Sequence, residues 1–342
     1  MSTHLNDSPR RWDKTLARRR NEFDVTDTVK VSSPSEVCQA VYKIYKDLYP
    51  EASFKALSKA FLDFQRLFSG EYPGYVGCDT VYHDIQHTMD MTLANARLIA
   101  GYERSVPLRD QIGPRRFTVS LITALFHDSG YIRRESETGV DNGAELTSNH
   151  VSRGAEFLSH YLPTLGLGDS SEVAASMVHY SGYEMPPEHI MLKEPKDRLA
   201  GFMLGTSDLM AQMADRCYLE KCRDRLYPEF VLAGIAVSKD GQGKARITYS
   251  SGDDLVQKTR EFYHQQVRKR LDKSFCGVHQ YFSGFFDGSN PYQSAIDKSI
   301  EYLDRTASDD VELKLRRQPP VFTSEDDSLD TVRGLVQLRL DT

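Results

Sequence analysis

The segment from Phe117 to Phe126, FTVSLITALF, is apolar on almost every side of a helix and runs directly into His127 and Asp128. A helix that is apolar all round belongs at the centre of a bundle. Its charged end is then buried as well, and an ionised carboxylate is very costly to desolvate unless it has a partner. The segment therefore predicts a helical core with a charged site inside it.

Apolar residues at helical spacing continue along most of the chain. Two helices are expected within residues 33–68, divided at Pro50 and capped by Ser33 or Ser35. The same spacing predicts further helices at 82–102, 144–162, 171–181, 197–230, 253–275 and 290–305. The turn-rich pentad KDGQG also permits one small β-hairpin between two of them.

Changes in composition suggest three parts. Residues 1–31 are polar and rich in arginine, which predicts a loosely held N-terminal arm. Residues 32–310 contain the predicted helices, and residues 311–342 form a charged, proline-containing C-terminal tail, either peripheral or a docking strap. The predicted fold class is all-α: a helical bundle with an N-terminal helical cap and C-terminal helices.

Charge and cysteine content exclude several classes of partner. With 43 basic and 49 acidic residues, the net charge of −6 argues against a nucleic-acid surface or a polybasic membrane patch. The five cysteines include no CxxC pair, and no run approaches the ~20 apolar residues of a membrane span. We therefore expect a cytoplasmic protein with free thiols, without nucleic acid or membrane as a partner; homo-oligomerisation is left open.

Histidines and acids recur at positions where a metal ion is expected. In YHDIQH, His83 and His87 are four residues apart, so they should project from one face of the first helical turns into the same cavity. Asp208, like Asp128, is an acid that directly follows an apolar run, here LAGFMLGTS, and is therefore expected to be buried. Imidazole nitrogens and carboxylate oxygens are usual ligands of divalent cations. A buried ion-pair network is the alternative interpretation.

The order His87, His127-Asp128, Asp208 resembles the HD superfamily of metal-dependent phosphohydrolases. YHDIQH is also similar to the YHNxxH signature of cyclic-nucleotide phosphodiesterases, and GTSDLMAQM resembles the segment that holds their last metal-binding aspartate. The resemblance implies an HD-type helical fold. It also implies that these four side chains bind metal and that His83 is the histidine that protonates the leaving oxygen.

The resemblance covers roughly residues 82–215 and departs from the phosphodiesterases after the dyad. Their HDxxHPG element is replaced by HDSGYIR, with Tyr131 at the place of the third histidine. His150 and His179 follow instead. Other branches of the superfamily, including cyclic-di-nucleotide phosphodiesterases and mixed-valent di-iron oxygenases, hold a second metal with two extra histidines in this interval. We therefore expect a dinuclear centre of Mn, Mg, Fe, Ni or Co, bridged by Asp128.

The leading functional hypothesis is a phosphohydrolase or phosphodiesterase that acts on a nucleotide or cyclic-nucleotide phosphoester. A metal-activated hydroxide would attack phosphorus, with Asp128 in the centre and His83 as general acid. A di-iron oxygenase on the same fold and a non-catalytic nucleotide-binding sensor remain as alternatives. Tyr131 is expected to close one side of the pocket. Gln280, in VHQYFSGFF, echoes the purine-selecting glutamine of the phosphodiesterases and is a weaker candidate for substrate contact.

Overall fold

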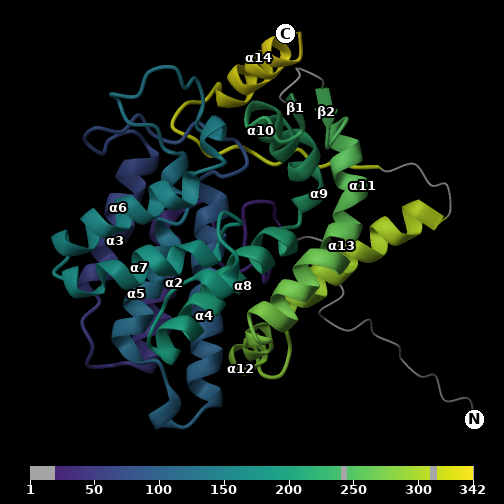
Figure 1. Ribbon diagram of the computed structural model, residues 1–342. Helices are drawn as coiled ribbons and strands as arrows, with labels where there is room; N and C mark the ends of the chain where they lie inside the picture. The colour runs from purple at the N-terminus through teal and green to yellow at the C-terminus, as the bar shows by residue number, and fades with distance from the viewer. Residues whose placement is uncertain (1–19, 240–244, 309–313, 342) are drawn as a thin grey trace, which may run out of the picture.

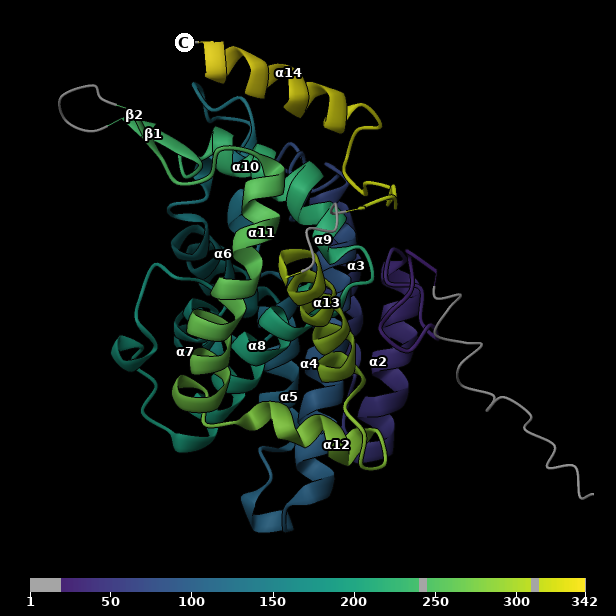
Figure 2. The ribbon, with the colours of Figure 1, turned by 90° about the vertical axis from the view of Figure 1, so that its right-hand side faces the viewer.

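The computed structural model describes residues 20–239, 245–308 and 314–341. These residues form a helical bundle with one small hairpin at its edge (Figures 1 and 2), so the predicted all-α class is confirmed. No helix among them is long and apolar enough to span a bilayer. The α-helices are α2 (Pro34–Leu48), α3 (Lys55–Phe68), α4 (Ile85–Ser105), α5 (Gly113–Leu125), α6 (His150–Thr164), α7 (Ser171–Met177), α8 (Pro195–Ala214), α9 (Tyr218–Lys221), α10 (Tyr227–Leu232), α11 (Gly252–Phe262), α12 (Phe282–Phe285), α13 (Pro291–Ser308) and α14 (Ser328–Asp341).

Local sequence explains where the first helices begin. The side-chain oxygen of Ser33 accepts a hydrogen bond from the backbone nitrogen of Glu36 at 3.4 Å, and Pro34 fills the first position of α2. Both features are typical of helix N-termini. Of the two serines that the sequence offered, Ser33 is therefore the cap. The predicted division at Pro50 is confirmed, since α2 and α3 lie on either side of it.

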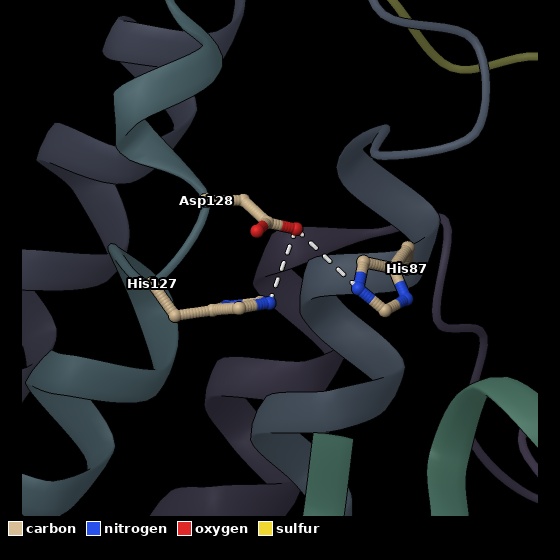
Figure 3. A group of neighbouring side chains, drawn as sticks. All are labelled: His87, His127 and Asp128. Carbon is tan, nitrogen blue, oxygen red and sulfur yellow. Dashed lines mark ion pairs between the residues drawn. The ribbon is translucent and has the colours of Figure 1, made fainter. Parts of the chain in front are cut away.

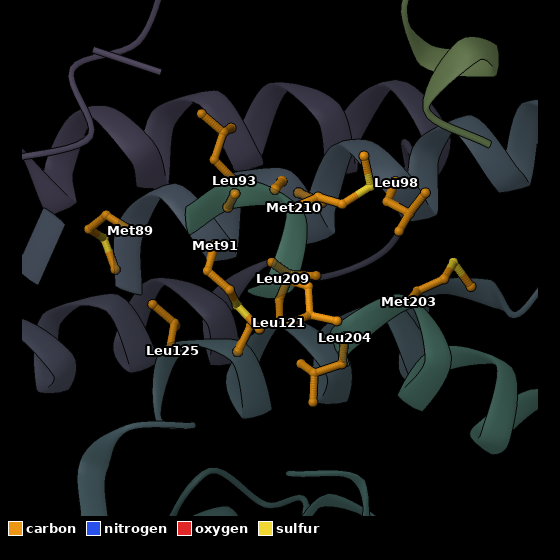
Figure 4. Packing of buried hydrophobic residues seen from close by; sticks show 14 of the residues in the cluster. Met89, Met91, Leu93, Leu98, Leu121, Leu125, Met203, Leu204, Leu209 and Met210 are labelled. Carbon is orange, nitrogen blue, oxygen red and sulfur yellow. The ribbon is translucent and has the colours of Figure 1, made fainter. Parts of the chain in front are cut away.

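The helix α4 runs through the centre of the bundle, with α5 and α8 packed along it. Full burial of a leucine or methionine side chain contributes about 1.5–3 kcal/mol. The dense packing around α4 therefore fixes the positions of the three helices that carry the candidate site. Figure 4 shows part of this core, in which the fully buried side chains include Met91, Leu93, Leu98, Leu121, Leu125, Met203, Leu204 and Met210.

Two predicted helices differ from the structure near the candidate site. The helix expected at 82–102 begins only at Ile85, because Asp84 is its N-cap in an extended conformation. His83 therefore lies in the preceding loop and not in the first turn as predicted. The helix expected at 197–230 is interrupted after α8, where Asp215 has an extended ψ of 131°. It resumes as α9, a π-helical turn (Cys222–Leu226) and α10.

The small hairpin is present. Strand β1 (Val237–Lys239) pairs antiparallel with β2 (Ala245–Ile247), and Val237 lies opposite Ile247. This confirms the hairpin that the KDGQG pentad permitted, while the turn itself lies outside the described residues. Both strands lie beside α10 and α11 (Figures 1 and 2).

The described part of the predicted N-terminal arm is packed against the bundle. Asp24 is fully buried, accepts a backbone hydrogen bond from Val29 at 2.7 Å and forms a salt bridge with Arg97 of α4 at 2.8 Å. Burial opposes the charge on Asp24, but Arg97 and the hydrogen-bond donors lower its pKa to about 2. The packed domain thus begins before the predicted boundary at residue 31, because a buried ion pair anchors it. Residues 1–19 lie outside the described part.

The C-terminal strap, which we define as residues 319–324, crosses the loop before α4. The backbone nitrogen and hydroxyl of Ser324 both donate to the carbonyl oxygen of Cys78 at 2.8 Å, and the carbonyl oxygen of Phe322 accepts from the nitrogen of Ile85 at 3.1 Å. Beyond the strap, α14 packs against α10 with Val332 fully buried. This part of the predicted tail is therefore held against the domain.

Candidate metal centre

Four side chains converge at one end of α4. His87 lies in its first turn, His127 and Asp128 directly follow α5, and Asp208 lies on α8. The Nε2 atom of His87 is 3.4 Å from both Asp128 Oδ2 and Asp208 Oδ1. The Nε2 atom of His127 is 3.1 and 3.8 Å from the same two oxygens. Both rings face one oxygen of Asp128 (Figure 3), so the structure brings together the four residues that the sequence assigned to one site.

Three buried atoms at this point have no hydrogen-bond partner among the described residues: His127 Nε2, Asp128 Oδ2 and Asp208 Oδ1. The close approach of His127 to Asp128 lacks hydrogen-bonding geometry. Leaving a buried polar atom unpaired costs about 1–3 kcal/mol. A single divalent cation would satisfy all three atoms. The residues present therefore fit a metal ion, and the buried group of His87, His127 and Asp128 could hold one.

His127 presents the nitrogen that a metal requires. Its Nδ1 donates to the carbonyl oxygen of Ala124 at 2.8 Å, so in the neutral ring the lone pair is on Nε2, facing the carboxylates. Burial alone would lower the pKa of His127, but Asp128 and, more weakly, Asp208 raise it to about 9. Since a cation at Nε2 must replace a proton, its binding is linked to pH.

His83 lies beside this group and is paired with an acid that the sequence analysis missed. Its Nδ1 is 2.6 Å from Oε2 of the buried Glu229, whose Oε1 accepts a hydrogen bond from the backbone nitrogen of Tyr82 at 2.6 Å. Burial would lower the pKa of His83, but the charge of Glu229, the hydrogen bond to it and the nearby charges of Asp128 and Asp208 together raise the pKa above its ordinary value. Glu229 lies 146 residues further along the chain, in the unremarkable segment YPEF.

Tyr131 lies between two histidine rings. Its ring stacks on His83 at a centroid distance of 4.4 Å and on His150 at 4.3 Å, with interplanar angles of 19° and 21°. Gly130 allows this approach, because a Cβ atom there would lie 1.8 Å from the carbonyl oxygen of His150. Tyr131 also lines the pocket described below, where the sequence analysis expected it.

His150 faces the other side of the central carboxylate. Its Nδ1 donates to the carbonyl oxygen of Thr147 at 2.7 Å, which leaves Nε2 as the free nitrogen, 4.0 Å from Asp128 Oδ1. Burial lowers the pKa of His150 more than Asp128 raises it. Asp128 thus presents Oδ2 to His87 and His127 and Oδ1 to His150.

Two predicted site residues are not among those that line the pocket. His179, in a short 3₁₀ helix (Val178–Tyr180), is not among the residues that line the pocket, and its Nδ1 is buried without a hydrogen-bond partner in the described part of the chain. Gln280 is exposed in another 3₁₀ helix (Val278–Tyr281), which abuts Gly101 near the far end of α4, roughly 21 Å along the helix axis from His87. A substrate contact by Gln280 does not fit this geometry, whereas a metal-ligand role for His179 stays a prediction.

A family model described as Npun_R2479-like matches residues 72–285, which is more than half of the chain. The chain belongs to the Npun_R2479-like family. The match includes every site residue from His83 to Glu229 and ends before α13, the C-terminal strap and α14. No curated protein and no protein of solved structure matches the chain.

In this Npun_R2479-like chain the candidate centre opens into a pocket of about 420 Å³. Its wall includes the cluster at His87, Asp128 and Asp208, with His83 and Tyr131 next to it. Hydroxyl and carboxylate groups of the α6 and α7 region line one flank, and apolar side chains from the α9–α11 region line another. A cavity of this size suits a small-molecule ligand.

Asp84 connects the start of α4 in this Npun_R2479-like chain with the C-terminal strap. It is fully buried; its Oδ1 accepts a hydrogen bond from the backbone nitrogen of His87 at 3.0 Å, and its Oδ2 accepts one from that of Phe322 at 3.1 Å. The guanidinium Nη1 of Arg225 lies 3.7 Å from the same Oδ2. Asp84 therefore positions the helix turn that carries His87.

We expect the substitution Asp84→Ala to lower the free energy of unfolding by about 2 kcal/mol, because a helix cap and a hydrogen bond to a buried charge are both lost. Urea denaturation followed by circular dichroism measures this. Asp84→Asn keeps an acceptor for the His87 nitrogen and should lose less. An Asp84→Ala protein as stable as the wild type would contradict the capping role.

Proposed function

We propose that the chain is a metal-dependent phosphohydrolase of the HD type that acts on a small-molecule phosphoester. One observation carries the proposal: an imidazole paired with a buried carboxylate, His83 with Glu229, lines the same pocket as a cluster of buried donor atoms without partners. The His83–Glu229 pair supplies an acid, and the cluster of buried donor atoms fits a divalent cation. A phosphoryl transfer site needs both functions close together.

Each group has a distinct task in this proposal. His87, His127, Asp128 and Asp208 would hold the cation, which when bound supplies Lewis-acid polarisation of phosphoryl oxygens and acidification of water. Protonated His83 would donate the proton on Nε2 to the leaving oxygen. Glu229 accepts the hydrogen bond from Nδ1 and so favours the charged ring. The stack with Tyr131 fixes the plane of that ring.

The test is a panel of phosphoesters with the purified protein in Mn²⁺, Mg²⁺, Fe²⁺, Ni²⁺ or Co²⁺. It includes cyclic mononucleotides, nucleoside polyphosphates and cyclic dinucleotides, the class that the resemblance to phosphodiesterases implies. Without oxygen, formation of a nucleoside monophosphate or a linear dinucleotide from the cyclic substrates, or release of phosphate, pyrophosphate or triphosphate from the polyphosphates, would support hydrolysis. Ligand binding without turnover under every metal would instead favour a sensor.

A di-iron oxygenase is the second candidate, and His150 is the observation that favours it. Its free nitrogen faces Asp128 Oδ1, where a second ion bridged by Asp128 could bind. The pairing of His83 with Glu229 favours the hydrolase, because oxygenation needs no imidazolium at that position. Oxygen consumption by the iron-loaded protein distinguishes the two. Metal analysis that finds two ions per chain would support a ligand role for His150.

Added metal is expected to stabilise the protein more strongly at higher pH. At a free metal concentration of 100 times Kd, binding adds about 2.7 kcal/mol to the free energy of unfolding. The pKa of His127 is raised to about 9, so below that pH a proton competes for Nε2 and the stabilisation should decrease as the pH falls toward 6. Thermal unfolding with each cation, with potassium at equal ionic strength as control, measures this. A melting temperature that no cation changes at any pH would contradict a metal site.

A further inference from the structure

The pocket continues beyond the candidate metal centre into an apolar slot. One wall comes from the helical segment α9 to α10, and the other from α11 and from Ile235 and Tyr249, which flank the hairpin strands. Figure 2 shows α11 running alongside this segment, and the two are in contact. The apolar side chains that line the slot include Cys222, Leu226, Phe230, Tyr249, Leu255 and Phe262.

The slot extends along two helical walls. Cys222, Leu226 and Phe230 follow one another at intervals of four residues and so lie along one helix face, which together with Tyr218 is roughly 15–18 Å long. Leu255 and Phe262 line the opposite wall two turns apart on α11. An apolar slot that extends along two helical walls suits an extended aliphatic chain.

Two polar side chains in this part of the pocket, Gln212 and Lys258, already have partners. Gln212 accepts a hydrogen bond from the Tyr82 hydroxyl at 3.1 Å and donates to the carbonyl oxygen of Asp208 at 3.3 Å. The ammonium group of Lys258 pairs with Asp254 and with the carbonyl oxygen of Thr248, both at 2.9 Å. Reading the edge of a nucleobase requires uncommitted donors and acceptors, and most of the hydrogen-bonding capacity of these two side chains is already used.

We infer that the pocket takes a phosphoester whose organic group is an aliphatic chain, with the phosphoryl group at the His87–Asp128–Asp208 cluster and the chain in the slot. The inference rests on the proposed function and narrows its substrate from nucleotides to amphiphilic phosphoesters. It assigns substrate selection to Leu226 and Phe230 on one wall of the slot and to Leu255 and Phe262 of α11 on the other.

The experiment measures the binding of monoalkyl phosphates from methyl to decyl to the manganese-loaded protein, by calorimetry below the critical micelle concentration. Burying one methylene contributes about 0.8 kcal/mol, so Kd should fall about fourfold for each added carbon until the slot is filled. Hydrolysis of the same esters is followed separately by phosphate release.

Two variants of slot residues and one control variant test whether the alkyl chain binds in the slot. Phe262, 36% exposed at the rim, tolerates a charge, and Phe262→Glu should weaken decyl phosphate binding at least tenfold while methyl phosphate binding stays unchanged. Leu255→Ala should also weaken the binding of decyl phosphate, but by a smaller factor. Leu62→Glu, which places the same charge on an exposed leucine of α3, should bind the whole series as the wild type does.

A Kd that does not depend on chain length, or a chain-length dependence that both slot variants retain, would overturn the inference. Nucleotide hydrolysis combined with no chain-length dependence would leave the proposed function intact and remove only the aliphatic substrate. Chain-length-dependent binding without release of phosphate from any ester would support the slot and count against hydrolysis.

Discussion

The substitution Asp128→Asn is expected to abolish metal binding and phosphoester hydrolysis together. Asp128 contacts His87 and His127 through one oxygen and faces His150 with the other, so its charge is shared by every candidate ligand histidine in the pocket. Loss of an outer partner of a metal ligand already costs about 10- to 100-fold in affinity. Removing a central carboxylate should therefore weaken metal binding by more than about 100-fold.

Metal content after dialysis and calorimetric titration with Mn²⁺ measure this effect. Asparagine has nearly the same shape as aspartate, so the far-ultraviolet circular dichroism spectrum should be unchanged. Asp169→Asn, which neutralises an exposed acid outside the pocket, is the matched control and should retain both metal and activity. An Asp128→Asn protein that holds metal at the wild-type stoichiometry would refute the proposed centre.

The second large effect is expected from His83→Ala, which should lower kcat by about 10²- to 10⁴-fold while the protein keeps its metal. The ring lies in the loop before α4 and is held by Glu229, so it is available as an acid without being required as a ligand. Steady-state kinetics and metal analysis of the same sample separate the two roles. His160→Ala, at an exposed histidine of α6, should behave as the wild type. Loss of metal with His83→Ala would make His83 a ligand instead.

Substitution of Glu229, the partner of His83, gives an independent test of His83 as the general acid. A general acid must be protonated, so kcat/KM falls as the pH rises through the pKa of His83, which Glu229 raises. With Glu229→Gln that carboxylate charge is gone, and the descending limb of the pH profile should move to lower pH. A profile with an unchanged limb would show that Glu229 has only a structural role.

The sequence predicted the positions of the central four residues because burial itself restricted them. A segment that is apolar on all sides, Phe117–Phe126, had to end inside the bundle, so His127 and Asp128 could not face solvent. Asp208 follows a similar apolar segment, and both acids need the same cation or counter-charge. Three buried helices around one core then bring these side chains together.

Other parts of the site depend on geometry that spacing does not encode. The partner of His83 is Glu229, which approaches only because the chain turns at Asp215 and α10 returns to the loop before α4. Helical spacing likewise gave no sign that Gln280 lies at the far end of α4. Periodicity indicates which face of a helix is buried. Which other buried surface that face contacts is determined by the loops and by the interruptions of the helices.

The C-terminal strap has a consequence for the order in which the protein is made. Asp84 and Phe322 are joined by a hydrogen bond although they are 238 positions apart, and Cys78 and Ser324 are 246 apart. A ribosome synthesises the first of each pair long before the second. The start of α4 therefore acquires these partners only after residues 319–324 have been synthesised, and a nascent chain that stalls before residue 319 lacks the hydrogen bonds that join Phe322 to Asp84 and Ile85.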